Sequence, residues 1–337
     1  MSASISTIGA FRHGGRLREA MAAFPDAPRP WLDLSTGINP EPWSGQRAPA
    51  DALRRLPDPL ELAELEAVAA RAFGVADAGR VVATSGAEAA LRLLPGLIGG
   101  GRVALLAPIY GGHVETWAGS TPDLIMSVAD LRALGADVLV LVNPNNPDGR
   151  RIERMTLAAL AQERSDAGRW TVVDESFGEV APELSVADLE IDRLVTLRSF
   201  GKFYGLPGVR LGFLIGNKMF TGEFRALLGD WPVGADALAM GLAAYADDAW
   251  KARTRMWLAT QAGAVDAVLA EAGLKFLGGC DLFRWVEAPD ARGLFTQLCA
   301  RGVLTRPFAD RPDRLRIGLP SCNEFNRLKH ALQAVTS

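Results

Sequence analysis

Five short apolar runs, each long enough for one β-strand, are followed at once by polar segments rich in Gly, Pro or Asn. The runs are nearly continuous in Val, Leu, Ile and Ala, which is typical of strands buried on both faces of a parallel sheet. The polar segments are residues 84–88, 108–113, 143–149, 174–177 and 199–210. Because parallel strands end at the same edge of a sheet, we expect these segments to converge on one crevice.

The chain is long enough for one large α/β domain and a smaller one, with 337 residues of which 49% are apolar and 22% charged. The predicted division is an N-terminal arm at 1–45, a large domain at 46–248 and a small C-terminal domain at 249–337, entered through a long helix that starts near Ala249. One strand of the small domain is expected at Val303–Arg306. A net charge of −3 without a long basic run gives no electrostatic support for nucleic-acid binding.

The cysteines and the apolar stretches point to a cytoplasmic protein. Cys280, Cys299 and Cys322 are odd in number and far apart, so we expect reduced thiols and no metal-ligand spacing. Three histidines make a histidine-rich metal site improbable. No apolar block follows the N-terminal arginines as it would in a signal peptide, and every long apolar stretch is broken by Gly, Pro or Arg, so no membrane span is expected.

Lys202 stands between two apolar runs, Arg193–Arg198 and Leu211–Ile215, on a loop flanked by glycines. Ser199 lies three residues before it and Arg210 eight residues after it. The amine of such a lysine can bond to the aldehyde of a Schiff-base cofactor, and the hydroxyl and the guanidinium can hold a phosphate of the same cofactor. The alternative is a surface lysine in a Gly- and Pro-rich loop.

The other segments carry matching chemistry. Thr84–Glu88 joins a strand to a helix, which directs N–H groups at an anion, although an ordinary turn with Ser85 as helix N-cap fits too. Tyr110 can stack on an aromatic ring or simply pack. Asn143–Gly149 reads Asn-Pro-Asn-Asn-Pro-Asp-Gly, which is a specific signal after a buried strand. Asp174 stands at the end of a strand, where open α/β sheets place ligands.

The Ser-x-x-Lys spacing with its later arginine resembles the lysine motif of fold-type I pyridoxal-phosphate enzymes, and the asparagine run resembles that of their histidinol-phosphate subgroup. The likeness extends from about His13 to the C-terminus. The chain looks closest to the threonine-phosphate decarboxylases of cobalamin biosynthesis, with histidinol-phosphate aminotransferases next. The resemblance implies an α/β fold with a mostly parallel seven-stranded sheet between helices, a small C-terminal α/β domain, and a homodimer with active sites at its interface.

The resemblance also implies roles for these residues. Lys202 would carry pyridoxal 5'-phosphate, Asp174 would pair with its ring nitrogen, Tyr110 would stack on the ring and Asn146 would donate to its 3-oxygen. His113 would lie near the ring. The residues expected to hold the cofactor phosphate are Ser85, Gly86, Ala87, Ser199 and Arg210.

The two ends of the chain would supply the substrate site. The arm is punctuated by Pro and Gly, so no helix is expected there. In the resembling families the arm contacts the substrate, and the arginines at 306 and 316 bind its anionic groups. The alternative is a surface arm and two exposed arginines on edge strands. The residues expected to bind substrate are His13, Gly14, Asn39, Asn146, Arg306 and Arg316.

Three positions depart from the wider superfamily. Leu56 replaces a tyrosine that reaches across the dimer to the cofactor phosphate, Asp148 replaces a threonine, and Phe177 replaces a tyrosine bonded to the 3-oxygen. The loss at 177 resembles the decarboxylase subgroup. The implied reaction converts L-threonine O-3-phosphate to (R)-1-amino-2-propanol O-2-phosphate. A histidinol-phosphate-type aminotransferase is the first alternative, and a relative that binds without catalysis is the second.

Overall fold

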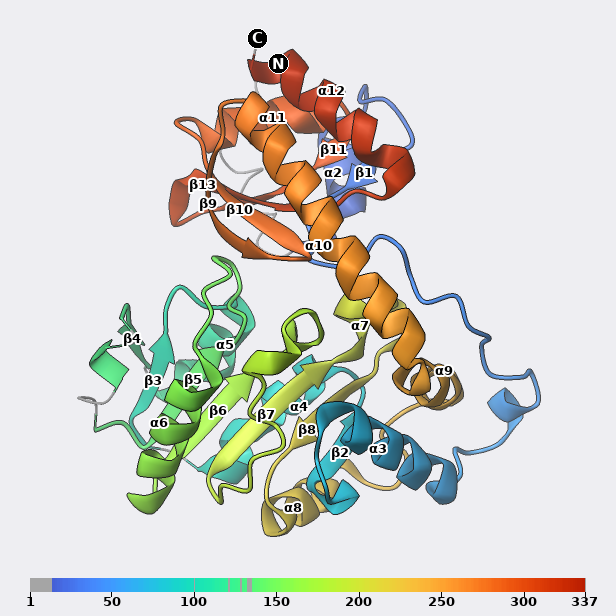
Figure 1. Cartoon of the computed structure of the whole chain (residues 1–337), viewed down its shortest axis with the longest axis vertical. Helices are drawn as coiled ribbons and strands as arrows, with labels where there is room; N and C mark the ends of the chain where they lie inside the picture. The colour runs from blue at the N-terminus through green and yellow to red at the C-terminus, as the bar shows by residue number, and fades with distance from the viewer. Residues whose placement is uncertain (1–13, 100, 121, 128, 132–134, 337) are drawn as a thin grey trace. The chain divides into compact units, whose positions relative to one another are not determined.

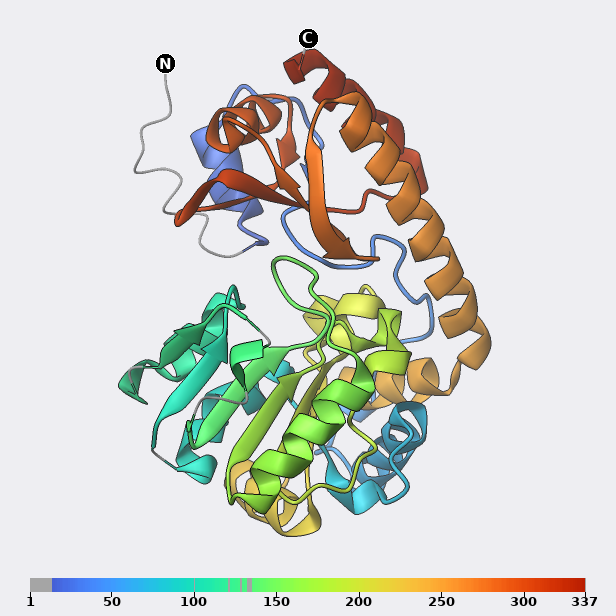
Figure 2. The same ribbon diagram turned by 60° about the vertical axis from the view of Figure 1, so that its left-hand side comes forward.

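The computed structural model describes residues 14–99, 101–120, 122–127, 129–131 and 135–336, and they form two compact units (Figure 1, Figure 2). The larger unit holds residues 42–146 and 150–252. The smaller unit holds the chain up to Glu41, the segment Pro147–Gly149, and the chain from Arg253 onward. His13, a predicted substrate residue, lies outside the described residues.

A seven-stranded sheet forms the centre of the larger unit within the described part of the chain. Its strands are β2 (Val81–Thr84), β3 (Val103–Leu106), β4 (Asp123–Ile125), β5 (Val138–Val142), β6 (Trp170–Asp174), β7 (Leu194–Ser199) and β8 (Gly212–Ile215). They follow the order β2-β8-β7-β6-β5-β3-β4. Among these strands β8 alone runs opposite to the other six, so the prediction of a mostly parallel seven-stranded sheet is confirmed.

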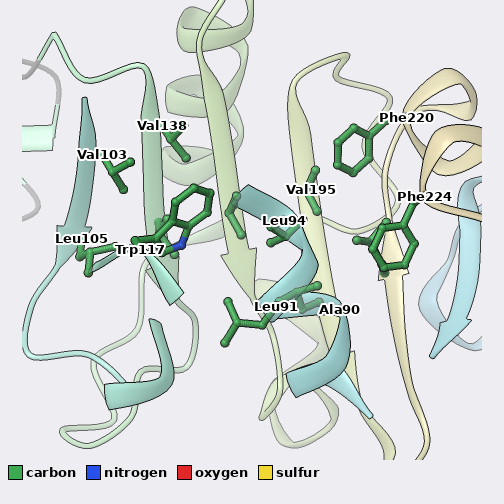
Figure 3. Close-up of a cluster of buried hydrophobic side chains, with 14 of the residues drawn as sticks. Ala90, Leu91, Leu94, Val103, Leu105, Trp117, Val138, Val195, Phe220 and Phe224 are labelled. Atoms are coloured by element: carbon green, nitrogen blue, oxygen red, sulfur yellow. The ribbon is translucent and has the colours of Figure 1, made fainter. Parts of the chain in front are cut away.

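Both faces of this sheet are covered, because successive strand residues point to opposite sides. Val138 packs on one face in a cluster with Trp117 and residues of α4 (Ala87–Ile98), as Figure 3 shows. Leu139 packs on the other face with residues of α6 (Arg154–Asp166). Burial on both sides explains why the strands read as continuous apolar runs.

The larger unit contains further α-helices beside α4 and α6. They are α3 (Pro59–Phe73), α5 (Gly111–Thr116), α7 (Phe200–Phe203), α8 (Lys218–Leu228) and α9 (Ala235–Ala246). Helix α3 ends at Gly74, which takes a left-handed conformation with a φ of 73°. The long helix α10 (Asp248–Glu271) begins in the larger unit and continues into the smaller one, at the predicted position. No helix of the described residues combines the length and the apolar character that a membrane span requires.

The edge strand β2 is closed by side chains instead of another strand. Glu66 on α3 accepts a hydrogen bond from the backbone N–H of Ala83 at 2.9 Å, and Arg225 on α8 donates to the carbonyl of Val81. Arg225 also pairs with Glu66 at 2.7 Å. The two side chains occupy the positions where a neighbouring strand would bond, which protects an edge that could otherwise pair with another chain.

The smaller unit contains a four-stranded antiparallel sheet in the order β12-β13-β10-β9 and a two-stranded parallel sheet of β1 and β11. The strands are β1 (Leu32–Asp33), β9 (Lys275–Cys280), β10 (Phe283–Glu287), β11 (Val303–Leu304), β12 (Arg306–Phe308) and β13 (Arg311–Gly318). Its helices are α2 (Leu17–Ala23), α11 (Ala291–Ala300) and α12 (Phe325–Thr336). The prediction of one strand at Val303–Arg306 is wrong, because the chain changes sheets at Thr305.

The expectation of no helix in the N-terminal arm is also wrong. Helix α2 (Leu17–Ala23) lies between Gly15 and Pro25, where the sequence has neither Gly nor Pro and is rich in Leu, Ala, Met, Glu and Arg. These are good helix formers. Its Ala20 is fully buried, so packing adds to the local preference that the composition of the whole arm concealed.

Replacing Glu66 by Ala should lower the free energy of unfolding by about 2–3 kcal/mol, because a buried N–H and a guanidinium lose their acceptor. The measurement is the urea midpoint followed by far-UV circular dichroism. Glu61→Ala is the matched control on the same helix, since Glu61 forms only an exposed pair with Arg55 and should change stability by less than about 0.5 kcal/mol. Equal effects of the two variants would contradict this account of the edge.

Candidate functional site

A cavity of about 280 Å³ opens at the carboxyl ends of the parallel strands, wholly within the larger unit. It joins segments that are far apart in the sequence, as the sheet order requires. Predicted site residues that line it are Gly86, Ala87, Tyr110, Asn146, Asp174, Ser199, Lys202 and Arg210. The polar segments that follow β2, β3, β5, β6 and β7 therefore meet at one place.

Lys202 lies on the single turn of α7 (Phe200–Phe203), directly after β7. A cluster of buried rings holds this turn from below: Phe200 stacks on Tyr204 with centroids 4.6 Å apart, and Tyr204 stacks on Trp250 at 5.5 Å. The amine of Lys202 is 5.9 Å from the ring centroid of Phe177 at the cavity wall. The lysine therefore faces the cavity from a rigid base, which excludes the surface-lysine alternative.

Asp174, the last residue of β6, is held by two hydrogen bonds. Its Oδ2 lies 2.9 Å from Nε2 of His113, which is fully buried, and its Oδ1 accepts from the backbone N–H of Ser176 at 2.8 Å. Burial disfavours the charged form of Asp174, but these bonds outweigh burial, and the pKa of the carboxyl lies below its ordinary value. Asp174 is thus an anion prepared to meet a cationic group in the cavity.

His113 is the partner that sequence reasoning left without a defined role. It sits on α5, and its ring makes an edge-to-face contact with Tyr110 at a centroid distance of 6.1 Å. His113 thus orients both the ring of Tyr110 and the carboxylate of Asp174. The signal was its position three residues after Tyr110, but the bond to Asp174 joins positions 61 residues apart, and no local pattern reveals it.

The turn after β2 leaves room for an anion beside a guanidinium. Gly86 has a φ of 90° and is the N-cap of α4. A Cβ at position 86 would lie 2.6 Å from Nη2 of Arg210, so only glycine admits the guanidinium this close. The positive end of α4 and Arg210 therefore act together at the same corner of the cavity.

Ser85 does not line this cavity. It is exposed, and its hydroxyl donates to the carbonyl of Pro232 instead of capping α4. The alternative in which Ser85 is the N-cap is wrong, because Gly86 takes that position. At position 85, only the backbone remains available for the predicted phosphate contact.

The three asparagines of the 143–149 segment have different places in the loop. Asn143 exchanges two hydrogen bonds with the backbone of Ile152, each 2.9 Å long. Asn145 donates to the carbonyl of Pro108 at 2.7 Å, which ties this loop to the segment that carries Tyr110. Asn146 lines the cavity. The first two asparagines therefore fix the loop, and the third lines the cavity.

The remaining predicted residues lie in the smaller unit. Arg316 on β13 is 4% exposed and donates to the carbonyl of Ser35 at 2.8 Å. Arg306 is its direct neighbour in the register of β12 and β13. The backbone of Gly14 also contacts Ser35, because a Cβ at 14 would lie 2.4 Å from that carbonyl oxygen. The alternative of two exposed arginines on edge strands is wrong for Arg316, which is buried on an inner strand.

Asn39 is buried in the same unit, and its Oδ1 accepts a hydrogen bond from the backbone N–H of Glu41 at 2.9 Å. This contact folds the turn that contains Pro40. The amide group of Asn39 is therefore at least partly used in the structure of the turn.

Comparison with known proteins gives a consistent result. The family model for aminotransferase class I and II matches residues 29–335. A threonine-phosphate decarboxylase from Sinorhizobium sp. is 39% identical over 95% of this chain and 97% of its own, and one from Pseudomonas aeruginosa is 37% identical over 92% and 93%. The crystal structure of histidinol-phosphate aminotransferase from Sinorhizobium meliloti, in complex with pyridoxal-5'-phosphate, has a TM-score of 0.83 and 19% identity over 100% and 98% of the two chains.

The lowered pKa of Asp174 predicts a pH-dependent stability in the ligand-free protein. A carboxyl whose pKa is lower when folded stabilises the fold above its unfolded pKa of about 3.9, and this contribution is lost as the pH falls through the folded value. The stability difference between wild type and Asp174→Asn should therefore shrink between about pH 5 and the acid limit of folding. Urea midpoints measured across this range test it.

The His113→Phe background provides the control. Without the hydrogen bond from His113, burial dominates, so the stability gained from ionised Asp174 above pH 5 should be smaller or reversed. An unchanged difference in this background would show that His113 does not maintain the charge of Asp174.

Proposed function

Because this chain belongs to the aminotransferase class I and II family, we propose that it is a pyridoxal-phosphate-dependent threonine-phosphate decarboxylase. The observation that carries the proposal is the identity of 39% and 37%, over nearly the whole chain, to proteins of that name. The reaction is the decarboxylation of L-threonine O-3-phosphate to (R)-1-amino-2-propanol O-2-phosphate, a precursor for cobalamin biosynthesis. Histidinol-phosphate aminotransferases match at lower identity, 30% for the one from Paramagnetospirillum magneticum over 80% of each chain, and the structural likeness at 19% identity supports the fold alone.

The residues around the cavity fit pyridoxal 5'-phosphate. An ionised buried carboxylate faces the cavity at Asp174, an amine faces it at Lys202, and Gly86 leaves space beside the guanidinium of Arg210. These three features match a ring nitrogen, an aldehyde and a phosphate. When bound, the cofactor supplies an electron sink for a bond broken at the substrate Cα.

We assign the following tasks to the residues at this site. Asp174 would hold the proton on the ring nitrogen, and His113 would keep Asp174 charged. Tyr110 would cover the ring and Asn146 would donate to its 3-oxygen. Lys202 would hold the cofactor aldehyde and would be placed to return a proton to the substrate Cα. Gly86, Ala87, Ser199 and Arg210 would bind the cofactor phosphate, with the backbone of Ser85.

The substrate anions are assigned to the smaller unit. Arg306 and Arg316 are cross-strand neighbours, and arginine side chains suit a phosphate or a carboxylate. Gly14 and Asn39 complete this group, and His13 remains a prediction outside the described residues. Together these residues would hold the distal phosphate of the substrate.

A cytoplasmic location is part of the proposal. Cys280, Cys299 and Cys322 form no disulfide, which suits a reducing compartment. Burial raises the pKa of the Cys299 thiol, so it is an inert core residue.

The decisive assay is CO₂ release from threonine phosphate without any keto acid. We expect release in the absence of 2-oxoglutarate, because decarboxylation needs no amino-group acceptor. Lys202→Ala should lose activity by about a thousandfold or more and should lose the visible absorbance of the bound cofactor. Turnover that depends on 2-oxoglutarate would favour an aminotransferase, and no turnover with retained binding would favour a non-catalytic relative.

We also propose that the active protein is a homodimer. A groove in the larger unit is lined by Pro59, Leu62, Leu228 and Trp231 among others, and Trp231 is 52% exposed. Three leucines at and before the start of α3 are also exposed: Leu53, Leu56 and Leu60. This apolar surface adjoins the turn after β2 that is assigned to the cofactor phosphate, because Pro232 accepts the hydrogen bond from Ser85. Leu56, in place of the usual tyrosine, would add apolar contact to such an interface.

The double variant Leu60→Glu, Trp231→Glu should convert the dimer to a monomer, because two charges would have to be buried at the interface. Sedimentation velocity over a range of concentrations measures it. Met155→Glu is the matched control, since Met155 is 78% exposed on α6, apart from the groove. A monomeric wild type, or a double variant that stays dimeric, would refute the assignment.

A further inference from the structure

A buried ion cluster lies directly beside the residues that form the cavity. Arg198, Glu175 and Glu179 are each 3% exposed or less. The guanidinium of Arg198 is 2.8 Å from Oε2 of Glu175 and 2.9 Å from Oε1 of Glu179. Glu175 comes directly after Asp174, the last residue of β6, and Arg198 comes directly before Ser199, the last residue of β7. Because strand residues alternate between faces, the ion pair occupies the side opposite to the two cavity residues.

The two carboxylates enclose a short turn that forms part of the cavity wall. Ser176 and Phe177, between Glu175 and Glu179, both line the cavity. The backbone N–H of Ser176 bonds to Asp174, and the ring centroid of Phe177 is 5.9 Å from the amine of Lys202. Whatever fixes the ends of this turn therefore fixes both contacts.

Gly178 shows how closely the guanidinium fits against the turn. A Cβ at position 178 would lie 2.7 Å from Nη1 of Arg198 and 3.1 Å from its Cζ. Any side chain there would displace the guanidinium from the carboxylates. Glu175 is further held by Ser185 and by the backbone N–H of Val186, at 2.6 and 2.7 Å.

The cluster differs from the other buried arginines of the larger unit. Arg164 donates to the carbonyls of Ala136 and Trp170 and to the hydroxyl of Thr171, all of which are uncharged acceptors. Arg198 instead binds two carboxylates, and burial raises the pKa of Glu175 against the attraction of the guanidinium. Burying such a cluster is costly, and apolar residues often stabilise a core as well. A role in placing nearby groups is a reason for its presence.

We propose that Arg198 is a positioning residue: by binding Glu175 and Glu179 at once it clamps the turn 175–179, and so sets Phe177 and the Ser176 N–H against Lys202 and Asp174. This inference rests on the proposed cofactor site. Loss of either carboxylate contact of Arg198 would let the turn relax. The bond from Ser176 to Asp174 would weaken, and water would enter beside the lysine.

Hydrogen exchange in the cofactor-free protein tests the clamp without relying on activity. Arg198→Lys keeps the charge but cannot bind both carboxylates as a fork. Glu179→Ala removes one of the two carboxylates that Arg198 binds. Both should accelerate exchange of the amides at 176–180 by about tenfold or more. Glu179→Gln should restore most of the protection, because its amide oxygen can still accept from Arg198.

The cofactor itself supplies the second readout. In both clamp variants the affinity for pyridoxal 5'-phosphate should fall about tenfold, which is the change expected from one weakened contact of about 1.4 kcal/mol, and the pH titration of the bound chromophore should shift. Arg164→Lys is the control: it should lower the urea midpoint while leaving the exchange of 176–180 and the titration unchanged.

The outcomes separate the two proposals. If Arg198→Lys and Glu179→Ala lower only the urea midpoint, as Arg164→Lys does, the clamp is refuted. If exchange responds as expected but threonine phosphate is not decarboxylated, the clamp stands and the proposed reaction fails. If wild type does not bind the cofactor, the role assigned to the clamp falls with the cofactor site.

Discussion

The alternation of side chains at the ends of β6 and β7 is the constraint on which the site depends. Asp174 and Ser199 face the cavity, so their chain neighbours Glu175 and Arg198 must face the other way, and there they pair at 2.8 Å. A cavity acid and a cavity hydroxyl are thus placed by an ion pair that no ligand touches. Shifting either strand by one residue would exchange the two sets and destroy both.

The rest of the larger unit keeps this pair of strands from moving. Apolar clusters cover both faces of the sheet, and β6 and β7 lie at its centre with strands on either side. The edge at β2 is closed by Glu66 and Arg225. The aromatic cluster under α7 supports the lysine in the same way, through rings that cannot shift separately because each contacts several others. Rigid packing therefore places the polar groups of the cavity.

The sequence predicted what depends on local pattern. Continuous apolar runs identified the strands, and polar segments after them identified the residues that line the cavity. Contacts between distant segments were beyond its reach: the bond from His113 to Asp174, the fit of Arg210 against Gly86, and the ion cluster of Arg198. The error at Ser85 has the same cause. Ser85 has the chemistry of an N-cap, but the neighbouring glycine takes that position and the Ser85 hydroxyl bonds to Pro232.

The position of the Phe177 ring depends on these contacts. Where a tyrosine hydroxyl would bond to the cofactor, this chain has a ring without polar atoms, 5.9 Å from the amine of Lys202. An apolar ring at this place keeps water away from the side of the lysine that faces it. The ring therefore has to stay close to the lysine to act. A phenyl group has no hydrogen bond with which to hold itself there, so its placement falls to the backbone of its turn, whose two ends carry Glu175 and Glu179.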